Sequence, residues 1–330
     1  MSALAAFVAH VLFALAFFSP GAFAQGIRPV SLDSLSALGL DSVGQIATAY
    51  FRSDDRARAL QLQSLLDEYL TFYRERMDIE SRMRIAVLDP PDWEQLTNVP
   101  YGLPNNSGPP YNILLGATVP PARVGARALP AGRLGDLLTV GHEGGHLLMW
   151  ELLPPDLGAA MSDSGPVPPD AMERFARIGQ VPVWYWEMTA NYFTTAFLEA
   201  THPDDARAWE DHLREISSIE RPRFTHLGDW FGAVLLAVAP DSTPYVFSTE
   251  GGLNQGWYQG VVGLVAVHIH EQAGFQFLDH LREILTGTVA PSTQELVERL
   301  DSIAPGTIEL LEELGAGYTD ETARSGTDPP

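Results

Sequence analysis

One short segment, His142-Glu143-Gly144-Gly145-His146, constrains this chain more than any other. On an α-helix, positions four apart lie on one face, so His142 and His146 can direct their imidazole nitrogens at the same ion. Two histidines alone cannot hold a catalytic zinc ion, which takes three protein ligands and keeps one position open. The fold must therefore bring a third ligand to this helix from elsewhere in the chain.

Glu143, next to the first histidine, is the candidate general base. It is too close to His142 to join it comfortably as a ligand, but its carboxylate can take a proton from water whose acidity the ion has raised. Each of the two glycines costs about 1 kcal/mol in a helix interior relative to alanine. They indicate that another backbone, for example that of the helix with the third ligand, or a substrate comes close. The alternative is a helix whose histidines are ordinary core or groove residues.

Glu187 is the best candidate for the third ligand. It is the one acidic residue of the apolar segment 183–197, where burying its carboxylate would be costly unless it met a cation. Asn191 lies four residues further on, hence on the same helix face, where its amide could orient a ligand. The alternative is a Glu187 that faces solvent beside a stripe of core residues.

These two segments, 142–146 and Glu187-Met188-Thr189-Ala190-Asn191, resemble the motifs of the gluzincins, a clan of zinc metallopeptidases that includes thermolysin. The resemblance implies Zn²⁺ bound by His142, His146 and Glu187, with Glu143 as base and acid and Asn191 steadying a histidine ligand. Two features depart from the pattern. The interval between His146 and Glu187 exceeds the thermolysin-like spacing of about twenty residues, and no aminopeptidase signature precedes the first motif.

A donor that stabilises negative charge on the substrate oxygen is expected opposite the base. Tyr258 resembles the tyrosine of the aminopeptidase branch of the clan and is the first candidate, although Trp257 could occupy that position instead. His226 is a thermolysin-like alternative, and His268 and His270 lie further along the chain. Any one of these histidines is more often an ordinary core or surface residue.

The composition excludes several classes of partner. There are 42 acidic and only 20 basic residues, and every basic residue is arginine. A chain with a formal net charge of −22 should repel nucleic acid and anionic membrane surfaces. With no cysteine it can form no disulfide.

The first 24 residues are typical of an export signal. An apolar run from residue 3 to residue 18 precedes Ala22-Phe23-Ala24, which is a cleavage-site pattern and predicts a mature chain that begins at Gln25. The predicted location is periplasmic or secreted. Because no basic residue precedes the apolar run, an uncleaved membrane anchor is the alternative.

The order of elements predicts an α+β fold. We expect helix over 32–83, a strand at 84–88, a loop at 98–110, a second strand at 111–117, and a motif helix that ends near residue 153. A long loop over 154–182 and a series of helices follow, at 184–200, 204–219, 256–273, 275–285, 292–303 and 307–314. Residues 25–135 form the expected N-terminal lobe of helices and sheet, 136–315 the mainly helical lobe, and 316–330 a polar tail. The resemblance implies a zincin-like arrangement with an active-site cleft between the lobes, and makes Asn112-Ile113-Leu114-Leu115 the edge strand that would hold an extended peptide. An ordinary core strand is the alternative.

The sequence therefore predicts an exported zinc-dependent metallopeptidase that hydrolyses a peptide or protein substrate through zinc-activated water. It predicts no stable membrane association unless the signal is uncleaved. A zinc-containing protein that binds a peptide or polymer without cleaving it is the main alternative, and hydrolysis of a non-peptide amide is a third.

Overall fold

The structure is a computed structural model that describes residues 30, 32–80, 82–97, 101, 104–107, 112–118, 132–154, 157, 171–218, 222–229 and 249–319. The predicted export signal therefore lies outside the described residues. Within them, no helix combines the length and the apolar character needed to cross a membrane. The chain divides into two compact units. Described residues before 122 and those of 136–179 form the first, and those of 132–135 and from 180 onward form the second. The sequence predicted that residues 136–179 belong to the helical lobe, whereas the described residues of that range group with the sheet.

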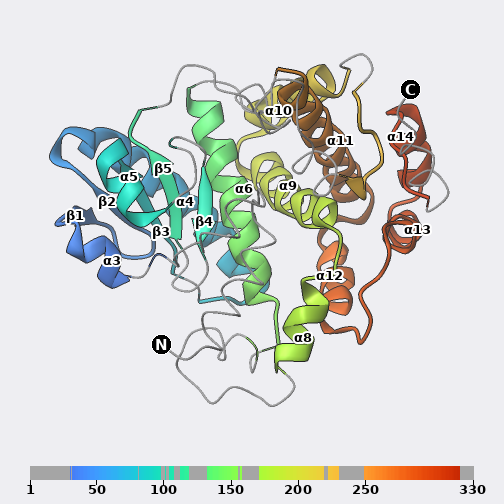
Figure 1. Ribbon diagram of the computed structural model, residues 1–330, viewed down its shortest axis with the longest axis horizontal. Helices are drawn as coiled ribbons and strands as arrows, with labels where there is room; N and C mark the ends of the chain where they lie inside the picture. Colours follow the sequence, from blue (N-terminus) through green and yellow to red (C-terminus); the bar gives the residue numbers. More distant parts are fainter. Residues whose placement is uncertain are drawn as a thin grey trace. The chain divides into compact units, whose positions relative to one another are not determined.

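The first unit contains a five-stranded mixed sheet with the order β1-β2-β3-β5-β4 (Figure 1). In chain order its elements are α3 (Leu32–Ala37), β1 (Asp41–Val43), β2 (Thr48–Phe51), η1 (Ser53–Asp55), α4 (Arg56–Met77), β3 (Arg84–Leu88), α5 (Pro90–Leu96), β4 (Asn105–Ser107), β5 (Asn112–Gly116), α6 (Arg133–Glu151) and α8 (Ala171–Ile178). The strands β2, β3 and β5 are parallel, and β1 and β4 pair antiparallel at the two edges.

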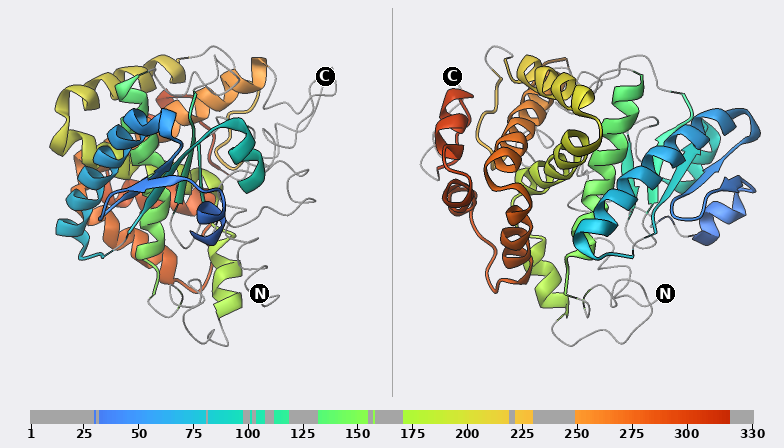
Figure 2. Two further views of the ribbon diagram at one scale, coloured as in Figure 1. Left: turned by 90° about the vertical axis from the view of Figure 1, so that its left-hand side faces the viewer. Right: turned by 180° about the vertical axis from the view of Figure 1, so that it is seen from behind.

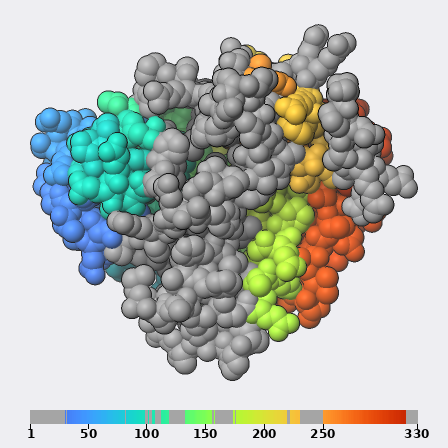
Figure 3. Space-filling model, in the orientation of Figure 1, coloured from blue at the N-terminus to red at the C-terminus, as the bar shows by residue number. Residues whose placement is uncertain are grey.

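The central strands are buried on both faces, which explains why they read as continuous apolar runs. Ala86 and Leu88 of β3 and Leu114 of β5 pack in one cluster with Trp93 and Leu96 of α5. The helix α4 packs on β2 and β3, and Figure 2 shows α4 and α5 on opposite sides of the sheet. In the space-filling view, residues of the N-terminal part of this unit, coloured blue to teal, form one continuous patch (Figure 3).

Residues Asp89, Pro90 and Pro91 explain why α5 begins where it does. The Asp89 carboxylate accepts a hydrogen bond from the Asp92 backbone amide at 3.0 Å, and two prolines occupy the first turn, where their missing N–H groups cost nothing. The Asp92 carboxylate in turn accepts two hydrogen bonds from the Arg52 guanidinium, at 2.8 and 2.7 Å. These contacts join the start of α5 to the end of β2.

Three predictions about the first unit are wrong. The expected helix over 32–83 contains the β1–β2 hairpin, whose turn includes Gly44 at φ +115°. The expected loop over 98–110 contains β4, and the expected loop over 154–182 contains α8. Each of these elements is short, so periodicity over a longer window could not detect it.

The second unit is helical. Its elements are α9 (Val183–Thr201), α10 (Pro203–Ser217), α11 (Thr249–Ala273), η4 (Gly274–Gln276), α12 (Phe277–Thr286), α13 (Thr293–Ile303) and α14 (Thr307–Glu313). The helices α9, α10 and α11 pack against one another, and α11 also contacts α12, α13 and α14. Close approach of α11 to α10 depends on Gly260, because a Cβ there would lie 2.7 Å from the Ser217 backbone nitrogen. The prediction of an α+β fold is thus confirmed in its coarse form, helices with a small sheet.

The strand Asn112–Leu115, expected at the edge of the sheet, is interior. It belongs to β5, which pairs with β3 on one side and β4 on the other, and all five of its residues are buried. The core-strand alternative is therefore the correct one. The edge strand next to it is β4, whose sequence Asn-Asn-Ser has low strand propensity and owes its conformation to pairing with β5.

Candidate metal centre

The two histidines of the motif share one face of α6, as their spacing requires. Their Nε2 atoms are 3.2 Å apart, and the ring centroids are 4.8 Å apart with the planes at 89°. His146 is buried and His142 is partly exposed. Two imidazole nitrogens this close can both reach one ion.

The helix α6 is positioned by a close contact with α4. A Cβ on Gly144 would lie 2.8 Å from Cε1 of Tyr69, whose ring is fully buried. Real Cβ atoms essentially never approach another atom so closely, so glycine permits the tyrosine ring to pack directly against the motif. The close neighbour of Gly144 is the side chain of Tyr69 on α4, whereas the sequence indicated another backbone, for example the ligand helix, or a substrate. Burial raises the pKa of the Tyr69 hydroxyl well above its ordinary value, so this side chain stays neutral.

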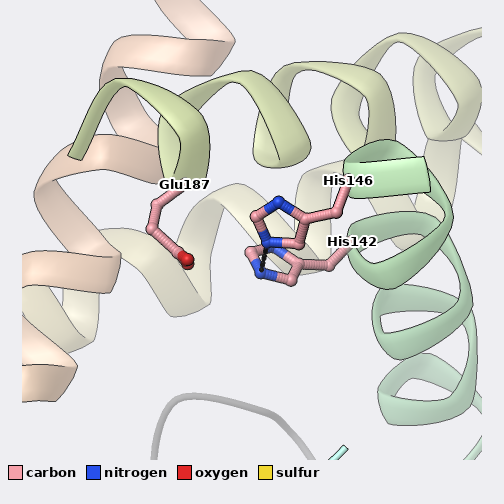
Figure 4. Close-up of side chains that lie close together, drawn as sticks. All are labelled: His142, His146 and Glu187. Carbon is pink, nitrogen blue, oxygen red and sulfur yellow. Dashed lines mark hydrogen bonds between the residues drawn. The ribbon is translucent and has the colours of Figure 1, made fainter. Parts of the chain in front are cut away.

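Glu187 is the third residue of the cluster. Its exposed fraction is 2%, which rules out the solvent-facing alternative. His142, His146 and Glu187 each offer one ligand atom, and these atoms all lie within 4.8 Å of one another. Figure 4 shows the histidine rings, which come from α6, close to the carboxylate, which comes from α9.

The chemistry of these donors fits a divalent metal ion. Two imidazole nitrogens and one carboxylate oxygen form a set that zinc accepts in catalytic sites. Other first-row metals accept the same donors. The three residues can therefore hold a metal ion, and their donor atoms do not distinguish zinc from these other metals.

Hydrogen bonds from α11 and α9 orient the Glu187 carboxylate. Gln259 of α11 donates from Nε2 to Glu187 Oε2 at 3.0 Å, and Asn191 donates from Nδ2 to Gln259 Oε1 at 3.4 Å. Asn191 thus contacts Gln259, which in turn contacts a candidate ligand. That Asn191 steadies a histidine, as the resemblance implies, stays a prediction. Sequence reasoning missed Gln259, although it adjoins Tyr258, which was singled out.

Glu143 is buried, with an exposed fraction of 3%. Its Oε2 accepts a hydrogen bond of 2.7 Å from Nδ2 of Asn106, which is itself buried. Sequence reasoning missed this residue, because the segment that contains it was assigned to a loop. The strand β4 therefore supplies a neutral donor that fixes the rotation of the candidate base.

The candidates for an oxyanion donor all have other partners. The Tyr258 hydroxyl donates to the His226 carbonyl oxygen at 2.5 Å, and Tyr258 is fully buried. The role of Tyr258 stays a prediction, and it would require this hydrogen bond to break. Each of the three candidate histidines also has a partner. His226 Nδ1 accepts a hydrogen bond from the Gly228 amide at 3.0 Å, so its Nε2 donates to the Thr319 carbonyl oxygen at 3.1 Å. His268 Nε2 donates to the Pro305 carbonyl oxygen at 3.1 Å, and His270 Nε2 lies 3.4 Å from a Glu199 carboxylate oxygen.

The described residues thus place a buried carboxylate, oriented by an amide, beside a histidine pair that belongs to a three-residue group able to hold a metal ion. Such an arrangement can hold a cation and move a proton beside it. Comparison of the chain with protein-family models, with curated proteins and with solved structures gave no match.

Proposed function

We propose that this protein is a zinc-dependent metallopeptidase. The observation that carries the proposal is the His142–His146–Glu187 group with Glu143 adjacent to its first ligand. A buried group of this kind is costly unless a cation compensates the carboxylate. The choice of peptide bonds among hydrolysable amides is supported by the resemblance to gluzincins.

In this proposal His142, His146 and Glu187 hold the ion. Zinc bound there would supply a Lewis acid that polarises a carbonyl and increases the acidity of water. Glu143 accepts a proton from the attacking water and later donates it to the leaving amine. Asn106 keeps the Glu143 carboxylate in one rotation during both transfers, because its amide donates to Oε2.

The test compares the wild-type protein with Glu143→Gln and with Glu151→Gln, a matched change on the same helix. Purified proteins are analysed for bound metal and are assayed on a mixed peptide library. We expect zinc in all three and cleavage in wild type and Glu151→Gln, with a loss of at least about a hundredfold in Glu143→Gln. Zinc without any cleavage that depends on Glu143 would support a binding protein, and cleavage of non-peptide amides alone would redirect the substrate assignment.

The third ligand has its own test. Glu187→Ala removes one of three protein donors, and we expect zinc affinity to fall steeply relative to wild type. Unchanged affinity would show that Glu187 is no ligand.

Export is part of the proposal and depends on residues 1–24. Expression of the full chain followed by determination of the amino terminus should give Gln25 in the exported fraction. A mature protein that retains Met1 in the membrane fraction would establish the anchor alternative.

A further inference from the structure

We infer that Gln259 is a positioning residue that sets the affinity of the metal centre, and that Asn191 contributes to the centre by holding Gln259 in place. This inference rests on the proposed function, because it assumes that Glu187 is a ligand. All three residues belong to the second unit, on the packed helices α9 and α11.

The direction of the two hydrogen bonds carries the argument. An amide side chain has one donor end and one acceptor end. The Glu187 carboxylate can only accept, so the Gln259 amide turns its Nε2 toward Glu187 and donates to Oε2; its Oε1 then accepts a hydrogen bond from Asn191 Nδ2. The Asn191 contact therefore holds the acceptor end of Gln259 and restricts rotation of the amide whose other end meets the carboxylate.

The spacing of the residues makes this relay possible. Glu187 and Asn191 are four residues apart on α9, hence on one helix face. Gln259 on α11 makes hydrogen bonds to both of them. Gln259 is only partly buried, whereas Glu187 and Asn191 each have an exposed fraction of 2%.

A neutral donor suits a carboxylate that must also bind a cation. Gln259 restricts the rotation of the Glu187 side chain and leaves its negative charge in place, whereas an arginine there would compensate the charge that the metal needs. Hydrogen bonds to metal ligands typically change metal affinity by about ten- to a hundredfold when they are removed.

The experiment measures zinc affinity by competition with a chromophoric chelator. The variants are Gln259→Met, which keeps the approximate volume and removes the donor, and Gln272→Met, a matched change at an exposed position of the same helix. We expect Gln259→Met to bind zinc about ten- to a hundredfold more weakly than wild type. Gln272→Met should bind as wild type does, and the thermal midpoints of the two metal-free variants should agree. Gln259→Ala serves as a second variant at this position if Gln259→Met does not fold.

The role of Asn191 is tested by Asn191→Leu, alone and combined with Gln259→Met. If Asn191 acts through Gln259, the double variant binds zinc as weakly as Gln259→Met alone. If Asn191 steadies a histidine instead, the two losses multiply, which overturns the relay. A change of less than about threefold in Gln259→Met also overturns it. Absence of zinc binding by the wild-type protein overturns the metal centre itself, so the two failures are distinguishable.

Discussion

Replacing Gly144 by alanine tests whether close packing of α4 explains this glycine between the two histidines of α6. Alanine in a helix interior is favoured over glycine by about 1 kcal/mol. The new methyl group would lie 2.8 Å from Cε1 of Tyr69 and 3.3 Å from two further ring atoms. Since that ring is fully buried on α4, it cannot rotate into solvent. Overpacking of this kind costs about 1–3 kcal/mol.

The two effects together predict that Gly144→Ala lowers the free energy of unfolding by roughly 0–2 kcal/mol, although helix propensity alone would raise it by about 1 kcal/mol. The assay is urea unfolding of the metal-free protein, followed by circular dichroism. Tyr69→Leu provides the background in which the ring is gone. There Gly144→Ala should stabilise relative to Tyr69→Leu alone, by about 1 kcal/mol.

The reasoning would be refuted if Gly144→Ala stabilised the otherwise wild-type chain by the full propensity difference. Equal effects in the two backgrounds would refute it as well, because a double-mutant cycle without coupling excludes the contact. Both outcomes would mean that α4 and its Tyr69 ring shift to accommodate the methyl group with little loss of folding free energy.

Three further predictions concern the base, the metal and a buried histidine. Asn106→Leu should lower kcat/KM by up to about a hundredfold while zinc content stays unchanged, because the Glu143 carboxylate loses the donor that orients it. Activity equal to that of wild type would exclude a positioning role for Asn106. Free zinc at about a hundred times its Kd should stabilise wild type by about 2.7 kcal/mol over the chelated protein, and a gain of the same size in Glu187→Ala would show that the ion binds elsewhere. Burial lowers the pKa of His280 below its ordinary 6.5, so the folded protein binds a proton at His280 less readily than the unfolded chain does. The neutral His280 therefore contributes stability above pH 6.5, and this stability is lost as pH falls from 6.5 through the lowered pKa. His280→Leu should flatten that loss in urea unfolding measured from pH 7.5 to 5, and an unaltered pH profile would contradict it.

Local pattern was sufficient for much of the helical unit. The apolar periodicity and the terminal residues predicted α9, α10, α12, α13 and α14 to within a few residues, although α11 begins earlier than expected. The strands β3 and β5 were also predicted, because their buried faces require unbroken apolar runs. Single charged residues in apolar surroundings carried information as well, since the isolation of Glu187 was the reason to propose it as a ligand.

The partners that orient the site could not be predicted in this way. Asn106 and Glu143 are 37 residues apart, and Gln259 and Glu187 are 72 apart. Helical and strand periodicities extend over a few residues only, so they carry no information about which amide will meet which carboxylate. The segment that contains Asn106 also has the composition of a loop, and only pairing with β5 makes it a strand.

The sequence by itself determined that His142 and His146 share a helix face with Glu143 beside them, because an α-helix repeats every 3.6 residues whatever surrounds it. Tertiary structure alone decided what supports these residues: the Tyr69 ring against Gly144, the Asn106 amide on Glu143, and Gln259 between Asn191 and Glu187. The physical reason is that a hydrogen bond or a packed ring requires two groups to meet in space, and the path of the chain between them is set by burial of the whole core.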